Sequence, residues 1–227
     1  MSTIPIHTIA SVRTDLPEKF GVPRQSGLAD LPARIVFEEP YRNADALRGI
    51  EQYSHLWIVW LFSEAQRENW SPTVRPPRLG GNRRVGVFAT RSPFRPNPIA
   101  LSSVRLERVE RHTPEGPILY IRGADMMDGT PVLDIKPYLP YTDAHPDACG
   151  GFAEHAKAYT LEVVLAPKCE GILSPEKEKI LCQLLAQDPR PAYQDDPSRE
   201  YRFTFSGHCV RFFVCDQILT VTGVDCL

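Results

Sequence analysis

Short β-type segments follow one another along most of the chain, and few helical patterns separate them. Each segment is rich in β-branched or aromatic side chains, which favour extended backbone. Strands that do not alternate with helices argue against the doubly wound α/β class. The pattern therefore predicts a mainly β fold with a barrel-like N-terminal domain. Its expected strands are Ile4–Val12, Ala33–Phe37, His55–Phe62, Arg84–Thr90, Ile99–Val109, Ile118–Arg122, Val132–Ile135 and Tyr159–Leu165.

Two segments of this domain carry a further expectation. Residues 43–53 form a candidate short helix, with Asn43 as its N-cap. The segment His55–Phe62 is nearly all apolar, so we expect it to be buried on both faces.

One clear helix begins late in the chain. Ser174 is a suitable N-cap, Pro175 fits the first helical position, and Glu176 favours the positive end of the helix dipole. Leucine and isoleucine then recur along one stripe, and we expect the helix to end before Pro189. Three strands follow, Tyr201–Phe205, Cys209–Cys215 and Ile218–Val224. We therefore predict two domains, a barrel-like domain at residues 1–165 and a small α+β domain at 166–227.

Composition limits the class of protein. The chain has 227 residues with 42% hydrophobic and 24% charged side chains, which are globular values. Its longest apolar run, Leu56–Phe62, is far shorter than the ~20 residues of a membrane helix. No secretory signal is evident, and the six cysteines form no CxxC pair, so we expect a cytoplasmic protein with reduced thiols. His145 and Cys149 fit no common zinc spacing, and no metal is expected.

The net charge of −2 conceals an uneven distribution. Residues 69–106 contain seven arginines and no acidic side chain or lysine, so this segment carries +7 and the rest of the chain −9. Such a segment is typical of a surface that binds phosphate or carboxylate, and arginine favours bidentate contacts. The alternative is an arginine-rich loop neutralised by acids from elsewhere in the fold. Prolines cluster in the same segment and predict stiff loops.

Asp134 and Lys136 lie two residues apart in an expected strand, so their side chains share one face. A carboxylate beside an ammonium can hold an amino acid moiety, or it can act as a base that the neighbouring charge tunes. A plain structural ion pair is the other interpretation. The residue pattern alone leaves these alternatives open.

Three polar segments together resemble the TrmO family. They are VPRQSGL at 22–28, RPPRLGGN followed by VGVFATRSPFRPNPI at 75–99, and DGTPVLDIKPYLPY at 128–141. DPRPAY at 188–193 resembles the C-terminal part of bacterial members. The resemblance spans nearly the whole chain. It implies a homodimeric methyltransferase with a single-sheet β-barrel that binds S-adenosylmethionine, and it agrees with the absence of a GxGxxG fingerprint.

The implied reaction is methyl transfer from S-adenosylmethionine to N6 of threonylcarbamoyladenosine at position 37, in the anticodon loop of tRNA. Transferred motif by motif, the resemblance implies a set of cofactor-binding residues. They are Pro23, Arg24, Gln25, Ser63, Glu64, Arg91, Leu101, Leu133, Asp134, Ile135, Lys136 and Pro137.

The catalytic hypothesis concerns the third motif. Because the target nitrogen is urea-like, it needs a group that takes its proton, and we assign that role to Asp134, supported by Lys136. Tyr138 or Tyr141 would orient the substrate, and Lys136 or Arg95 would pair with the threonine carboxylate.

The arginine-rich segment would meet the phosphates of the anticodon loop. Its candidate tRNA-binding residues are Arg75, Arg78, Arg83, Arg84, Arg95 and Asn97. Trp70, Phe88 or Phe94 could stack on unpaired bases, although the position of Phe88 in an expected strand favours the core.

Two alternatives come from other functional classes. One is a non-catalytic module that binds a nucleotide or cofactor through its arginines. The other is an RNA-binding β-barrel that only presents loops. Methyl transfer to modified tRNA separates the enzyme from both.

Overall fold

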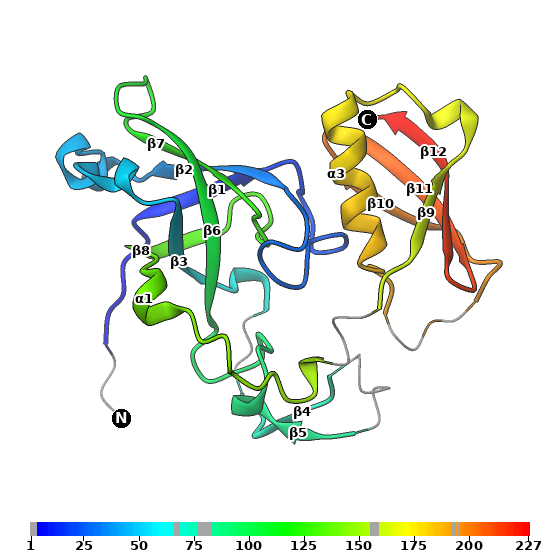
Figure 1. Cartoon of the computed structure of the whole chain (residues 1–227), viewed down its shortest axis with the longest axis horizontal. Coiled ribbons are helices and arrows are strands. Elements are labelled where there is room, and N and C mark those ends of the chain that lie inside the picture. Colours follow the sequence, from blue (N-terminus) through cyan, green and yellow to red (C-terminus); the bar gives the residue numbers. More distant parts are fainter. Residues whose placement is uncertain (1–3, 66–68, 77–82, 155–158, 192–193, 195) are drawn as a thin grey trace.

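The computed structural model describes residues 4–65, 69–76, 83–154, 159–191, 194 and 196–227 (Figure 1). Its N-terminal domain is a closed six-stranded barrel with neighbours in the order β1-β2-β7-β6-β3-β8, and β8 pairs back onto β1. The predicted barrel in a mainly β fold is confirmed. Its strands are β1 (Ala10–Thr14), β2 (Pro32–Phe37), β3 (His55–Leu61), β6 (Ile99–Glu110), β7 (Ile118–Arg122) and β8 (Pro131–Pro137).

The central strand β3 is buried on one face only, so the expectation of two buried faces is wrong. Leu56, Ile58 and Trp60 face the barrel interior and are buried. Trp57 and Val59 point outward and are half-buried, although they are equally apolar. A closed barrel has one interior, and its outer face is covered only in part, where Tyr138 and Asp143 contact Trp57.

Three expected strands are clearly shorter than the sequence indicates, and one of them is Tyr159–Leu165, whose strand begins only at Glu162. Ile4 and Ile6 are exposed, and the strand β1 begins only at Ala10, next to Ile9, whose backbone bonds to Val132 and Glu38. The segment 84–90 contains only the short β5 (Val85–Gly86), which pairs with β4 (Thr73–Val74), and then turns into η6 (Val87–Ala89). Neighbouring prolines limit the backbone donors available for a longer ladder.

Short 3-10 turns complete the barrel domain. Instead of one helix at 43–53, the chain forms η2 (Ala44–Leu47) and η3 (Ile50–Gln52), separated by Gly49 with a φ of 88°. Asn43 caps η2 as expected, since its side chain accepts a hydrogen bond from the backbone of Asp45. The remaining short elements are η1 (Glu39–Tyr41), η4 (Ser63–Ala65) and α1 (Pro140–Asp143).

The C-terminal domain packs one helix, α3 (Pro175–Ala186), against a four-stranded sheet of order β10-β11-β12-β9. Ser174 caps α3 as predicted. The last three strands form the expected antiparallel meander, and β9 (Glu162–Leu165) joins it parallel to β12. The sheet thus begins a few residues before position 166. The meander strands are β10 (Tyr201–Phe205), β11 (His208–Cys215) and β12 (Ile218–Cys226), and η7 (Pro167–Cys169) follows β9.

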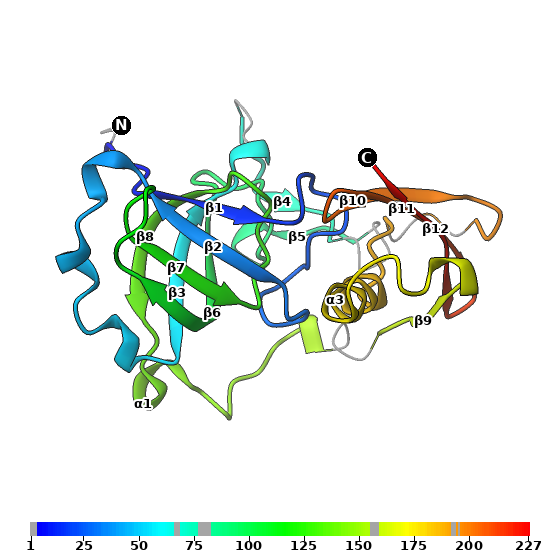
Figure 2. The same ribbon diagram turned by 90° about the horizontal axis from the view of Figure 1, so that it is seen from above.

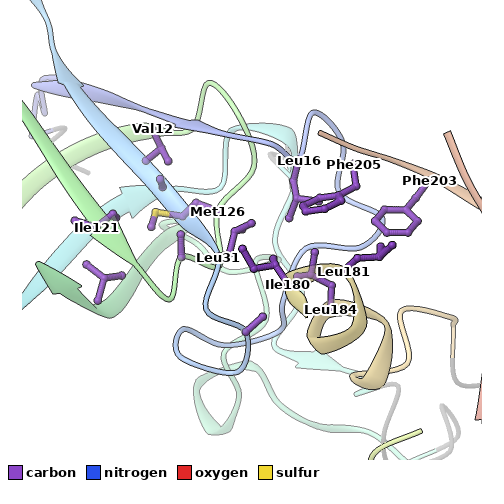
Figure 3. Close-up of a cluster of buried hydrophobic side chains, with 14 of the residues drawn as sticks. Val12, Leu16, Leu31, Ile121, Met126, Ile180, Leu181, Leu184, Phe203 and Phe205 are labelled. Carbon is purple, nitrogen blue, oxygen red and sulfur yellow. The ribbon is translucent and has the colours of Figure 1, made fainter. Parts of the chain in front are cut away.

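The two domains share a continuous apolar core. Helix α3 lies on the barrel side of the C-terminal sheet (Figures 1 and 2), and its residue Leu181 packs in one cluster with Leu31 and Met126 of the barrel domain (Figure 3). Gly21, with a φ of 94°, lies against the ring of Phe203 from β10. The barrel and the C-terminal domain therefore hold a defined relative position. No helix among the described residues is long and apolar enough to cross a membrane.

Candidate functional site

The outer faces of β6, β3 and β8 bring one predicted group of cofactor residues together. Leu101 on β6 and Asp134 on β8 both pair with Val59 of β3, so the three side chains form one row across the sheet. The next row contains Lys136 opposite Trp57. Leu101 is 52% exposed, which leaves an accessible apolar side chain beside a charged pair.

A β-bulge places Asp134 on this face. Val59 pairs with Asp134, whereas the next residue of β3, Trp60, pairs with Val132, so Leu133 is the extra residue. Val132 consequently points into the core while Asp134 points outward. The Nζ of Lys136 lies 2.8 Å from Oδ2 of Asp134, which confirms that the two residues share a face. Both side chains remain open to solvent.

An aromatic pair borders the charged pair. The ring of Tyr138 packs on Trp57 with centroids 5.4 Å apart. The indole Nε1 of Trp57 donates to Oδ2 of Asp143 at 2.8 Å, and this bond fixes α1 against β3. The hydrogen bond from the Leu139 amide, followed by that from Trp57, lowers the pKa of Asp143. Asp143 and Trp57 were not expected to support the site.

A second group lies where the first and second motifs meet. A guanidinium nitrogen of Arg91 donates to Oε1 of Gln25. Behind them, Ser102 donates to Oδ1 of Asp125 at 2.6 Å and accepts from Nε1 of Trp60 at 2.9 Å. Burial raises the pKa of Asp125 to about 6, against the opposing hydrogen bond from Ser102 and the charge of Arg91.

Sequence reasoning missed Asp125 because it belongs to none of the three motifs and its partners lie far away along the chain. Ser26 contributes a backbone hydrogen bond to the same carboxylate, so Asp125 connects the VPRQSGL loop to β6. Buried carboxylates with shifted pKa values cluster at functional sites, which marks this residue for a test.

Arg24 faces the C-terminal domain. Its Nη2 donates to the carbonyl of Asp188 at 2.9 Å and to that of Arg190 at 3.4 Å. The side chains of Asp188 and Arg190 form a bidentate pair at 2.8 and 3.0 Å. Burial opposes ionisation of Asp188, but the hydrogen bonds from Arg190 hold its pKa below the ordinary value. The DPR segment thus meets the first motif at the domain junction.

The other predicted cofactor residues differ in their exposure to solvent. Ser63 and Glu64 are exposed in η4, where the carbonyl of Glu64 accepts from Nζ of Lys19. Pro23 is buried, and Pro137 is exposed at the end of β8. Ile135 pairs with Ile58 and packs against the core, so only its backbone reaches the outer face.

A hollow of about 2180 Å³ extends from this region toward the C-terminal domain. Leu61, Gln25 and Arg91 line its barrel side, and Arg190 lines the opposite side. Because Leu61 shares the outer face of β3 with Val59, the hollow adjoins the row that contains Asp134. Asp134, Lys136 and Tyr138 do not line it themselves.

Four of the six predicted tRNA-binding residues line this hollow. Those that line it are Arg75, Arg84, Arg95 and Asn97. Arg83 is exposed next to Arg84, and Arg78 lies outside the described residues. Within the described part of the segment, only Arg105 makes an ion pair, with Asp30 at 3.4 Å. General neutralisation by acids, the alternative interpretation of the segment, is therefore not what the described residues show.

The described residues contain no group of three or more His, Cys, Asp or Glu side chains placed to hold a metal ion. His145 and Cys149, the nearest candidates in sequence, follow α1 in an exposed segment.

Two family models match the chain. The tRNA-methyltransferase O N-terminal domain matches residues 11–144, and the TrmO C-terminal domain matches residues 158–226. These matches cover both the barrel and the domain that follows it.

Relatives and solved structures are consistent with these family matches. A tRNA (adenine(37)-N6)-methyltransferase of Escherichia coli is 43% identical over 99% of each chain. A protein with the same name from Eikenella corrodens is 52% identical over 70% of this chain and 90% of its own. A crystal structure of TrmO from Pseudomonas aeruginosa superposes with a TM-score of 0.80 at 33% identity, covering 100% of this chain and 99% of the other.

Proposed function

Because the chain belongs to the TrmO family, we propose that it is an S-adenosylmethionine-dependent methyltransferase that acts on N6 of adenine 37 in tRNA. The observation that carries this proposal is the full-length similarity to an Escherichia coli enzyme of that name. Two groups of motif residues support it, the pair of Gln25 with Arg91 and the row of Leu101 and Asp134 across β3.

The side chains of these two groups suit the cofactor chemically. Its methionine part carries an ammonium and a carboxylate, which Asp134 and Lys136 can respectively pair with. Gln25 and Arg91 add hydrogen-bond groups, and Leu101 adds an apolar contact. When bound, S-adenosylmethionine supplies an electrophilic methyl group.

The residues of the chain then have mainly to align the target nitrogen and take one proton. We assign proton acceptance to a carboxylate oxygen of Asp134. The ammonium of Lys136, 2.8 Å away, supports its negative charge. Tyr138, held against Trp57, orients the substrate from the same face.

The specific substrate in this proposal is the threonylcarbamoyl form of adenosine 37. Such a base carries a carboxylate, and Arg95 and Lys136 are candidate partners for it. Arg95 lines the hollow and donates to the carbonyl of Thr90, so it is held at the wall that the anticodon loop would approach.

A homodimer completes the proposal. The outer face of β6, β3 and β8 exposes Leu101 and leaves Trp57 and Val59 partly accessible, even with Tyr138 packed on Trp57. A second copy would cover this face and exclude water from the transfer. Sedimentation of the purified protein, alone and with tRNA, measures this directly. A tRNA-modifying role also fits a cytoplasmic location.

Mass spectrometry of tRNA nucleosides tests the main claim. The enzyme is incubated with methyl-labelled S-adenosylmethionine and two tRNA pools, one with and one without threonylcarbamoyladenosine. We expect the label on N6 of the modified nucleoside in the first pool only. Label on unmodified adenosine 37 would show that the threonylcarbamoyl group is not required. No label in either pool would favour the non-catalytic module.

A further inference from the structure

Two aromatic side chains next to the arginine-rich hollow are unusually open to solvent. Trp70 is 51% and Phe88 72% exposed, and both line the hollow. Their ring centroids lie 6.1 Å apart with an interplanar angle of 32°. They flank the small β4–β5 sheet, which Figure 1 shows beneath the two domains.

The local backbone holds this pair in place. Val87 is buried and its amide donates to the carbonyl of Pro72 at 2.9 Å, which joins η6 to the segment that follows Trp70. The turn of η6 therefore sends Val87 inward and leaves Phe88 outside. This corrects the expectation that Phe88 belongs to the core. The Phe88 ring is exposed because residues 87–89 form a turn and not a strand.

The charges around the pair indicate what it binds. Arg84, whose Nη1 donates to Oγ1 of Thr73, and Arg75 line the same hollow. No acidic residue occurs between positions 69 and 106. Exposed aromatic rings beside arginines suit unpaired nucleotides, because the rings stack on bases while the guanidinium groups contact phosphates.

A second copy of the chain suits this patch less well. In a two-fold dimer centred here, the patch would meet itself, and arginines would face arginines. The charge thus favours a polyanion.

We propose that Trp70 and Phe88 form a stacking platform for unpaired bases of the tRNA anticodon loop. This inference rests on the proposed function and adds to it the surface that reads the single-stranded part of the substrate. The platform holds bases of the loop while the target nucleotide reaches the barrel face. It contributes to tRNA binding and not to cofactor binding.

Paired substitutions test the platform. Trp70→Leu and Phe88→Leu each remove a ring, whereas Trp70→Phe keeps one. Tyr41→Leu removes a surface ring from η1, which does not line the hollow, and serves as the matched control. Stacking on one ring corresponds to roughly a fivefold to hundredfold change in affinity. We expect each leucine variant to weaken tRNA binding about tenfold, and Trp70→Phe to restore most of it.

Salt dependence separates stacking from charge. A stacking ring releases no counterion, so the slope of log affinity against log salt should stay unchanged in both leucine variants. Calorimetric affinity for S-adenosylmethionine should also stay unchanged. Trp70 is exposed, whereas Trp60 is buried and Trp57 only partly exposed, so tRNA should quench the wild-type fluorescence more than that of Trp70→Phe.

Other outcomes would overturn the inference. Unaltered tRNA affinity in the Trp70→Leu, Phe88→Leu double variant would exclude a platform. A change in sedimentation without a change in tRNA affinity would assign the patch to a second copy. Both results are independent of the proposed activity, because label transfer by the wild-type enzyme is measured separately.

Discussion

At the scale of single residues, two carboxylates differ in their exposure to solvent. Asp134 is open to solvent beside an ammonium, whereas Asp125 is enclosed with a raised pKa. The exposed carboxylate is available as a proton acceptor on the barrel face. The enclosed one organises the loop that carries Gln25.

Asp134→Asn should reduce methyl transfer by about 10² to 10⁴ in kcat, the usual contribution of a proton acceptor. Cofactor affinity, measured by calorimetry, should fall by a smaller factor, because the amide loses the ion pair with the cofactor's ammonium but keeps the shape and one acceptor oxygen. The opposite pattern, with normal turnover and poor cofactor binding, would reassign Asp134 to binding alone.

Asp125 should make stability depend on pH. Its pKa is raised from 3.8 to about 6, so its contribution to folding is fully present below about pH 4 and is lost as the pH rises through 6. From pH 4 to pH 7, we expect the wild type to lose at most about 3 kcal/mol relative to Asp125→Asn. Denaturant unfolding of both proteins at several pH values measures the difference. A constant difference would mean that the carboxyl is already ionised at pH 4.

At the scale of elements, the arginine-rich segment around β4 and β5 should dominate tRNA binding. Replacing Arg83 and Arg84 with alanine should weaken binding and reduce the salt slope by roughly 1.4 to 1.8 units. Lys168→Ala with Lys179→Ala removes the same charge from exposed sites of the C-terminal domain. An equal effect of this control pair would show that only net charge matters.

At the scale of the whole molecule, the domain junction should be sensitive to Gly21. A Cβ there would lie 2.5 Å from the ring of Phe203, and the φ of 94° already disfavours a side chain. Gly21→Ala should therefore lower the free energy of unfolding by about 2 kcal/mol or more.

Gly27→Ala is the control for that substitution, since it has a φ of 78° but no atom within 4 Å of the added methyl. It should lower the free energy of unfolding only by the cost of a side chain at positive φ, about 1 kcal/mol. Equal midpoints in thermal unfolding would mean that the Phe203 ring moves aside without cost.

Much of the fold follows from local pattern. The strands of the barrel, the capped helix α3 and the shared face of Asp134 and Lys136 are set by side-chain periodicity and by capping chemistry. These properties depend on residues a few positions apart, so they can be read from the chain.

Other features depend on contacts between residues far apart in the sequence. The barrel covers one face of β3 and leaves the other open, although both are apolar. A turn at η6 buries Val87 and exposes Phe88. Asp125 meets Ser102 and Ser26 only after β-strands far apart in the sequence have paired. Neighbouring residues thus specify most of the elements, the charge segregation and the family motifs. Which side of each element is covered, and which distant groups meet, depends on long-range pairing and was decided by the tertiary structure alone.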